Sequence, residues 1–504
     1  MPLAFSTCSV VSFSSEARIP PPGLWPYIRR LVYIGVPDPL CLAKEIEHLP
    51  RLRAITFQRA KAGVPFSVIE QCLRHPRIVS LSFPLEDSDW NSECNSLAYR
   101  APPWPSDMPY PNALERLSYT SYPWKTTRAG FERYDLCKED VVEASHLGPL
   151  ILGMHMSAES LSFPIDVAPL ARLVELSWPR LRDLTLTGRY SHASQAFSTA
   201  SLVGSMSRPR SLSIQVTQLA DCCRPMVLEK HRLRLTDMHG LERLTIAYPN
   251  PDDHIFSAAG PSLRRLSLRD YPRHYTGALT THMYEMDGMT MPILSSCECL
   301  QILSRMSMPR LEHLELVYEA DDLEEELLAH VTSAYPHLQT LELHQYRASC
   351  GSVALRFDRV SELLASVKTL RTVHLNLDYT REDTTALDPD WPGTQYDDDD
   401  QEYFRWPSST ALVQYGSALL ESMERPGGCP VLDALYLLYF DACHHEGQHR
   451  WVRFLPARYP GTEAERVDWD DDYQRLDSPP PYEPDWTPTW RTKRLQCHPT
   501  SSPR

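Results

Sequence analysis

Residues 309–316 read PRLEHLEL, the clearest copy of a phrase that recurs along this chain of 504 residues. The phrase consists of a proline, any residue, and then apolar residues at its first, fourth and sixth positions. Because strand side chains alternate between two faces, positions four and six point to one face, while position one packs from the preceding turn. The proline cannot donate a ladder hydrogen bond and therefore fits just ahead of a strand. Each copy predicts one strand of a stacked sheet.

Further copies occur along most of the chain. Strong copies begin at Leu52, Ile78, Leu181, Leu263, Leu311, Leu338 and Leu432, weaker copies begin at Ile28, Leu114, Leu241 and Leu370, and a degenerate strand lies near Leu161. Helix-like apolar spacing is found in several of the intervals, namely in residues 40–49, 66–73, 323–331, 360–367 and 412–423. A strand, a turn and a helix repeated every ~22 to 32 residues predict a repeat architecture, in which neighbouring units bury what one unit cannot.

This pattern resembles the irregular leucine-rich-repeat regions of fungal F-box-like proteins, over roughly residues 26–440. The resemblance implies an α/β solenoid with parallel strands on its concave face and helices or loops on its convex face. The asparagine or cysteine usual in that family after the sixth position is replaced by Ala60, Tyr271, Glu319 and Tyr346 in four good copies, so we expect an irregular solenoid. The alternative is an ordinary α/β domain with leucine-rich parallel strands.

The chain divides into three parts by composition. We expect residues 1–25 to be a poorly ordered N-terminal segment and residues 26–458 to form the solenoid. The solenoid contains an acidic insertion at 381–405, which is too charged and too poor in apolar residues to fold alone. Residues 459–504 are rich in Pro, Asp and Trp, which predicts a largely disordered tail.

The net charge and the cysteine pattern limit the classes of partner and the cell compartments that we expect for this protein. The formal net charge is −15, and binding to a phosphate backbone needs a basic footprint, so we expect no nucleic acid partner. No apolar run approaches the length of a membrane span, and no secretion signal can be drawn at the N-terminus. Thirteen cysteines without a C-x-x-C pair indicate reduced thiols in a cytoplasmic or nuclear protein.

Common catalytic and cofactor motifs are missing from the sequence, and we therefore expect no catalytic residue, metal or cofactor. The alternative is an enzyme with an unrecognised site. The cluster of Cys443, His444, His445 and His449 has zinc-ligand types but no second pair of recognisable spacing, so a polar loop is the better interpretation. Acidic runs such as 397–400 lack the order of a calcium loop and are interpreted as solvated charge.

The repeat register also predicts a binding surface, because positions three, five and seven of each strand point away from the core. We expect these residues to line the concave face and to contact a protein partner, and we expect Glu315, Glu342, His344, His374 and Tyr436 to be solvent-accessible on one surface. The candidates are Arg243, Arg265, Arg269, His313, Glu315, Glu342, His344, His374, Asn376 and Tyr436. Glu315, Glu342 and His374 should be neighbours in one row, and the two carboxylates should need a cation, a histidinium or a partner's basic residue nearby.

The favoured function is a non-enzymatic protein-binding scaffold that recognises substrates for a ubiquitin ligase. The resemblance implies a Skp-type adaptor as partner, although no F-box is visible before the first repeat-like strand at Ile28. The alternative is a generic structural or interaction protein with no ubiquitin link. In the tail, Pro479, Pro480 and Tyr482 belong to a P-P-x-Y match, which is a ligand type for WW domains.

Overall fold

The computed structural model is an α/β fold built on one long, mostly parallel sheet. It describes residues 6–11, 21–35, 39–58, 64, 66–83, 114–120, 136–190, 193–217, 224–228, 238–271, 273, 292–347, 357–377, 384–385, 406–407, 409–425, 428–441, 448–456 and 465–467. The acidic insertion lies almost wholly outside these ranges, as do the P-P-x-Y match and Cys443 to His445.

Seventeen of the described strands belong to a single sheet, whose neighbours mostly follow chain order. These strands are β1 (Thr7–Val11), β2 (Arg30–Ile34), β3 (Ala54–Gln58), β4 (Ser80–Phe83), β5 (Arg116–Tyr119), β6 (Ser160–Pro164), β7 (Asp183–Arg189), β8 (Ser211–Thr217), β9 (Arg243–Ala247), β10 (Arg265–Arg269), β11 (Leu294–Ser295), β12 (His313–Ala320), β13 (Thr340–Arg347), β14 (Thr372–Asn376), β17 (Ala434–Asp441), β18 (Gln448–Phe454) and β19 (Glu465–Val467). The pairs up to β14–β17 are parallel, and β17–β18 and β18–β19 are antiparallel. A separate two-stranded sheet pairs β15 (Thr384–Thr385) with β16 (Trp406–Pro407).

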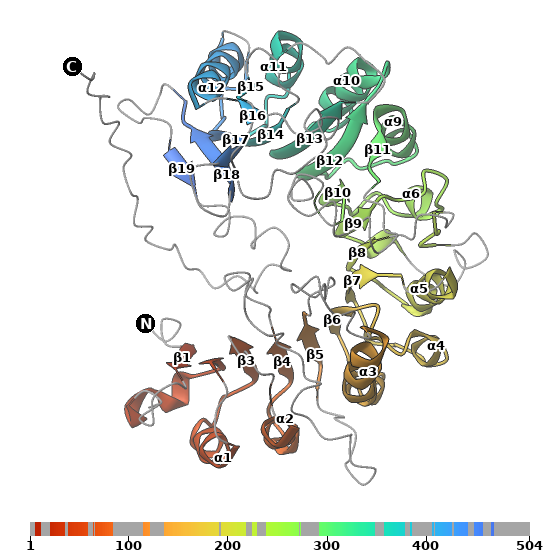
Figure 1. Cartoon of the computed structure of the whole chain (residues 1–504), viewed down its shortest axis with the longest axis vertical. Coiled ribbons are helices and arrows are strands. Elements are labelled where there is room, and N and C mark those ends of the chain that lie inside the picture. The colour runs from red at the N-terminus through yellow and green to blue at the C-terminus, as the bar shows by residue number, and fades with distance from the viewer. Residues whose placement is uncertain are drawn as a thin grey trace.

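The sheet curves into an open arc, with the strands on the inner side and the helices on the outer side (Figure 1). The α-helices are α1 (Pro39–His48), α2 (Phe66–Arg74), α3 (Leu136–Gly153), α4 (Leu170–Leu173), α5 (Ala193–Ser205), α6 (Ile255–Ala258), α9 (Ser296–Ser304), α10 (Glu324–Ala334), α11 (Phe357–Ala365) and α12 (Ser409–Glu424). Consecutive helices such as α9, α10, α11 and α12 pack side by side. The helices expected at 40–49, 66–73, 323–331, 360–367 and 412–423 are confirmed.

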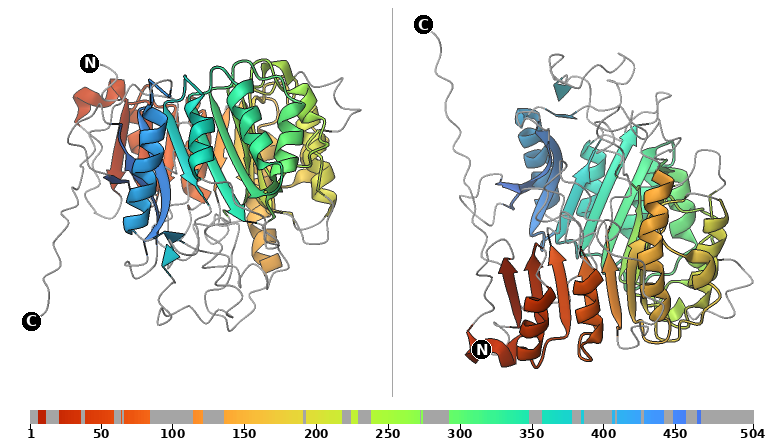
Figure 2. Two further views of the ribbon diagram at one scale, coloured as in Figure 1. Left: turned by 90° about the horizontal axis from the view of Figure 1, so that it is seen from above. Right: turned by 60° about the horizontal axis from the view of Figure 1, so that its bottom comes forward.

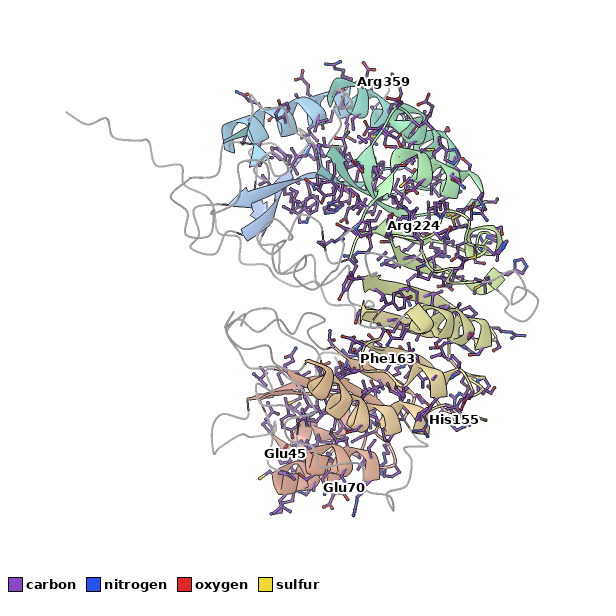
Figure 3. The ribbon with its side chains drawn as sticks, turned by 45° about the vertical axis from the view of Figure 1, so that its right-hand side comes forward. Glu45, Glu70, His155, Phe163, Arg224 and Arg359 are labelled. Atoms are coloured by element: carbon purple, nitrogen blue, oxygen red, sulfur yellow. The ribbon has the colours of Figure 1, made fainter. Side chains whose placement is uncertain are left out.

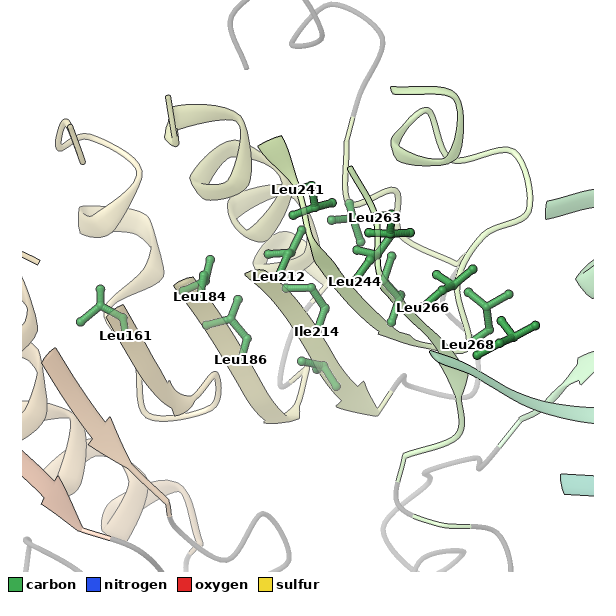
Figure 4. Close-up of a cluster of buried hydrophobic side chains, with 14 of the residues drawn as sticks. Leu161, Leu184, Leu186, Leu212, Ile214, Leu241, Leu244, Leu263, Leu266 and Leu268 are labelled. Atoms are coloured by element: carbon green, nitrogen blue, oxygen red, sulfur yellow. The ribbon is translucent and has the colours of Figure 1, made fainter. Parts of the chain in front are cut away.

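The core lies between the sheet and the helices and is built from the repeated apolar positions. Position four forms an unbroken row of buried side chains, of which Leu161, Leu184, Leu212, Leu244 and Leu266 form the middle (Figure 4). At roughly 1.5–3 kcal/mol for each fully buried side chain, such rows supply the main stabilisation of a stacked repeat.

Position six of the first strands carries aromatic residues rather than leucine. The rings of Tyr33 and Phe57 lie 6.0 Å apart, those of Phe57 and Phe83 lie 5.5 Å apart, and Tyr119 meets Phe83 edge-on at 6.1 Å. These ring separations fall in the favourable range for aromatic pairs. At position six, the first strands therefore carry aromatic rings, whereas the copies from β7 onwards carry leucine or isoleucine there.

The structure adds strands that the repeat pattern did not predict. β8 was missed because its first position is the buried Pro209, which breaks the proline-leucine phrase although Leu212 and Ile214 follow the rule. β1 lies within residues 1–25 and pairs with β2, and β19 lies within the expected tail and pairs with β18. The parallel strands expected near Leu52, Leu181, Leu263, Leu311 and Leu338 are confirmed and share one sheet.

Candidate functional site

The inner face of the sheet carries an uninterrupted row of hydroxyl side chains at position five. Parallel pairing brings these residues side by side on eight consecutive strands, from β3 to β10. We call this set the hydroxyl row: Thr56, Ser82, Ser118, Ser162, Thr185, Ser213, Thr245 and Ser267. All but Ser267 are partly exposed. Since neighbouring strands lie about 4.8 Å apart, the row spans about 34 Å of the inner face.

The same row changes chemistry after β10. Ser267 pairs with Glu315, Glu315 with Glu342, Glu342 with His374, and His374 with Tyr436. The predicted row of Glu315, Glu342 and His374 is therefore confirmed. The hydroxyl of Ser267 donates a hydrogen bond of 2.6 Å to Glu315 Oε2, so the two parts of the row are directly joined.

These acidic side chains belong to a buried group that we call the charged cluster: Arg269, Arg273, Glu315, Glu342, His344 and His374. Glu342 is 1% exposed and His344 is fully buried, and the other four members are at most 9% exposed. Our expectation that Glu315, Glu342, His344 and His374 are accessible is therefore wrong, and the candidate Asn376 is buried as well. Arg269 is also buried, whereas Arg265 is exposed and Arg243 and His313 are intermediate. Strand alternation correctly predicted that these residues share one face of the sheet. It does not predict the solvent exposure of the side chains on that face.

Arginines supply the positive charge that the two carboxylates need. Arg273 lies just beyond β10 and places Nη2 2.5 Å from Glu315 Oε1 and 3.6 Å from Glu342 Oε1. Arg269 Nε lies 3.8 Å from the same oxygen of Glu315. Arg273 Nη1 also lies 3.1 Å from Oδ1 of Asp270, which is 1% exposed, so two guanidinium groups face three buried carboxylates.

Glu315, Glu342 and His344 also have the types and spacing of metal ligands, with candidate ligand atoms within 4.8 Å of one another. Two carboxylates and one imidazole suit several divalent cations. The guanidinium of Arg273, however, already pairs with both carboxylates. The guanidinium therefore takes the place of a cation between the two carboxylates. A divalent ion there would lie against a buried like charge, so the residues do not fit a resident metal.

Histidines complete the cluster and are packed by aromatic rings. His344 Nε2 lies 2.8 Å from Glu342 Oε1. The His374 ring stacks on Tyr436 at 4.3 Å, and Trp451 meets the rings of His374 and His344 edge-on at 5.0 and 5.8 Å. Trp451 comes from β18, whose antiparallel pairing with β17 sets it opposite Leu438. The closing strand thus places a large aromatic side chain against both histidines.

Burial and hydrogen bonding shift the titration of this group. Burial lowers the pKa of His374 to about 4, although the charge of Glu342 opposes that shift. Burial also lowers the pKa of His313. For Glu342, burial alone would raise the pKa, but the hydrogen bond from His344 and the charges of His344 and Arg273 outweigh it. The pKa of this carboxyl is held far below its usual range.

The remaining predicted residues have separate contacts. Arg243 lies 3.5 Å from Asp183, and it pairs in register with Arg265 on the next strand. Asn376 Nδ2 donates a hydrogen bond of 3.2 Å to the Tyr346 hydroxyl. Tyr436 is partly exposed. The predicted residues lie on one face, but only some of them reach the surface.

Sequence reasoning missed Arg273, Trp451 and the hydroxyl row. A signal existed for the hydroxyl row, because every copy from β3 to β10 has Ser or Thr at position five. No repeat-based signal existed for Arg273 or Trp451, since one follows a strand and the other lies on an antiparallel strand outside the repeat.

Comparison with known proteins adds no assignment: no protein-family model matches the chain, and no curated protein matches it significantly. Among the helices that the structure describes, none has the length and apolar character needed to cross a bilayer.

Proposed function

We propose that the chain is a non-enzymatic, protein-binding solenoid of the leucine-rich-repeat kind, which binds its partner along the hydroxyl row. The observation that carries this proposal is the row of Ser and Thr on eight consecutive strands, of which all but Ser267 are partly exposed. Small hydroxyl side chains contribute little to the core, yet they offer hydrogen-bond donors and acceptors at regular spacing. The sheet holds them rigidly, so a partner would bind with little ordering cost on this side.

The more specific form of the proposal is that the protein recognises substrates for a ubiquitin ligase in the cytoplasm or nucleus. Its support is the resemblance of the repeat phrase to the regions that follow F-box modules. A generic interaction scaffold without a ubiquitin link is the alternative. Binding of the purified protein to a purified Skp-type adaptor, measured by calorimetry, separates the two: saturable binding favours the ligase role, and its absence leaves the generic scaffold.

The inner-face proposal is tested by blocking the hydroxyl row. The variant Ser118→Arg/Ser162→Arg puts two long charged side chains on neighbouring strands β5 and β6 of the inner face. The matched control, Ser304→Arg/Ser333→Arg, adds the same charge at exposed positions of the outer helices α9 and α10. Partners that crosslink to the wild-type protein should be lost from the first variant by about tenfold and retained by the second. Equal retention by both variants, with unchanged circular dichroism, would contradict binding at the hydroxyl row.

The WW-ligand proposal concerns the tail and has its own test. A peptide spanning residues 477–490 is titrated against a panel of WW domains, with Tyr482→Ala as control. Because a proline run is already in the required conformation and the tyrosine is the directional anchor, only the wild-type peptide should bind. Binding unaffected by the substitution would reject Pro479, Pro480 and Tyr482 as a WW site.

A further inference from the structure

One edge of the sheet, where the parallel strands begin, has a charge opposite to that of the whole chain. The second residues of successive copies are joined there by a continuous ladder of main-chain hydrogen bonds. It runs from Arg53 N to Arg29 O at 2.8 Å, strand after strand, to Asp433 N and Arg371 O at 2.7 Å. The strands between β2 and β17 therefore start side by side along one rim (Figure 2). We call this edge the basic rim and define it as the five residues that end at position three of each copy.

Basic residues strongly outnumber carboxylates on the basic rim. The described rim residues include sixteen Arg and Lys against six Asp and Glu, in a chain whose formal net charge is −15. The basic residues are Arg29, Arg30, Arg51, Arg53, Arg77, Arg116, Arg180, Arg182, Arg208, Arg210, Arg243, Arg264, Arg265, Arg310, Lys368 and Arg371. The acidic residues are Glu115, Glu159, Asp183, Glu242, Glu312 and Asp433.

All six rim carboxylates are engaged by rim arginines. Arg180 lies 2.5 Å from Glu159 and 3.7 Å from Glu115, and the other four pairs, with atoms 2.7 to 3.7 Å apart, join neighbouring or nearby strands. Those four are Arg210 with Glu242, Arg264 with Glu312, Arg243 with Asp183, and Arg371 with Asp433. Rim carboxylates therefore neutralise only a minority of the rim's positive charge.

The excess is greatest at the N-terminal end of the rim. Arg29, Arg51, Arg53 and Arg77 are exposed and Arg30 is partly exposed, and no carboxylate occurs on the rim before Glu115. These five arginines come from the starts of β2, β3 and β4. Like charges held this close repel one another unless an anion lies between them, so the arrangement lowers the stability of the free protein and favours an anionic partner.

We propose that the N-terminal part of the basic rim binds a short acidic peptide segment of a partner protein. This inference rests on the scaffold function proposed above, but it names a different surface and the chemistry that the surface recognises. Every basic residue in this part is arginine, whose guanidinium can bind a carboxylate through two parallel hydrogen bonds. The starts of three adjacent strands span about 10 Å, which matches three or four residues of extended peptide.

A nucleic acid fits this surface less well. Past the arginine-only part the rim carries eleven basic residues against six carboxylates, so its net positive charge is spread more thinly along the later strands. A long polyanion would gain less on each of those strands, and beyond the rim it would meet a protein of strongly negative net charge. A short acidic peptide can remain on the arginine-only part. Charge complementarity of this local kind sets partner choice and encounter rate more than total affinity.

The test uses the full chain and a fluorescein-labelled peptide of Glu and Asp, about eight residues long, titrated by fluorescence anisotropy at low salt. The rim variant Arg51→Gln/Arg53→Gln should weaken binding by about tenfold, and raising the salt should weaken the wild-type complex as well. The control Arg172→Gln/Arg359→Gln removes the same charge at exposed positions of α4 and α11 (Figure 3 shows Arg359 at the outer side) and should bind like wild type.

Three results would overturn the proposal. Equal weakening by both variants would show that only net charge matters, and no wild-type binding at low salt would remove the site. Tighter, rim-dependent binding of a single-stranded oligonucleotide or of phosphatidylserine vesicles would assign the rim to those ligands instead. The inner-face test is independent, because Ser118→Arg/Ser162→Arg leaves the five arginines of the N-terminal rim in place. Loss of peptide binding only in the rim variant therefore supports this inference even if the hydroxyl row binds nothing.

Discussion

The hydroxyl row and the charged cluster occupy the same face, and in part the same repeat position, yet one is surface and the other is interior. Ser118 and Ser162 are partly exposed, whereas Glu315 and Glu342, at the same position, are buried. Position in the repeat decides the face, because side chains alternate along a strand. Burial is decided by what surrounds the position, here the arginines and the aromatic residues of the last strands. The repeat register therefore predicts the face to which each side chain points, but it does not predict how far that side chain is exposed to solvent.

The two regions also differ in how they depend on their neighbours. Each partly exposed hydroxyl of the row can exchange a protein partner for water at little cost, whereas Ser267 is buried against Glu315. In the charged cluster, removing one partner leaves the other charge buried and unpaired. The free-energy cost of that unpaired charge is much larger than the net stabilisation that the intact ion pair contributes. The C-terminal part of the inner face should accordingly be the more sensitive to mutation and to acid.

The largest effect is expected at a core position beside this row. Leu314→Asp should destabilise the protein by more than about 4 kcal/mol and unfold at least the neighbouring repeats, because it buries an unpaired charge between sheet and helices. Ser162→Asp, on the inner face, should change stability by less than about 1 kcal/mol. Urea unfolding followed by circular dichroism compares them. Wild-type melting of Leu314→Asp would show that the face assignment is wrong.

A somewhat smaller loss is expected when the cluster loses its arginine. Arg273→Met should cost about 3–5 kcal/mol, since Glu315 and Glu342 would remain buried without their main countercharge. Arg265→Met removes an exposed arginine of the preceding strand and serves as the control. If both variants unfold at the same urea concentration, the ion pairs of Arg273 contribute little to stability.

Acid should destabilise the charged cluster selectively. His374 has a folded pKa of about 4, below its unfolded value of 6.5, so between these values the unfolded chain binds more protons. Stability is therefore fully present above pH 6.5 and falls as the pH drops towards 4, by about 3 kcal/mol for this group. The lowered pKa of Glu342 also makes the protein less stable in acid, because below the usual carboxyl pKa of 4.5 the unfolded chain binds a proton that the folded protein does not.

His374→Phe keeps a ring against Tyr436 and cannot be protonated, so its stability should depend less on pH between 6.5 and 4. Denaturant midpoints measured across this interval check the difference. A pH dependence identical to that of wild type would mean that His374 does not titrate as its burial requires.

The smallest effect is expected in the hydroxyl row. Ser118→Ala/Ser162→Ala should change the free energy of unfolding by less than about 1 kcal/mol, because the partly exposed hydroxyls can be replaced without leaving a buried polar group unpaired. Thermal unfolding of the wild-type protein and the variant measures this change. A loss comparable to that of Arg273→Met would remove the distinction between the two regions.

Much of this fold was predictable because the repeated apolar positions indicate where each strand lies and which face its side chains take. The proline-leucine phrase located most parallel strands, and alternation placed Glu315, Glu342 and His374 in one row, as the register confirms. The prediction missed β8, where Pro209 takes the place of the usual leucine. It also missed β1, which is not preceded by the phrase. Pattern search finds a strand only where the pattern is complete, whereas hydrogen bonding to a neighbouring strand needs no pattern.

By itself, the sequence determined the strand periodicity, the face of each side chain and the order of residues along each row, because these follow from alternation and from stacking neighbours in chain order. Only the tertiary structure decided that the charged cluster is interior. Arg273 reaches it from beyond the end of β10, and Trp451 reaches it from an antiparallel strand far along the chain. Burial depends on the sum of all neighbours in space, and such neighbours are not encoded in the period of any single segment.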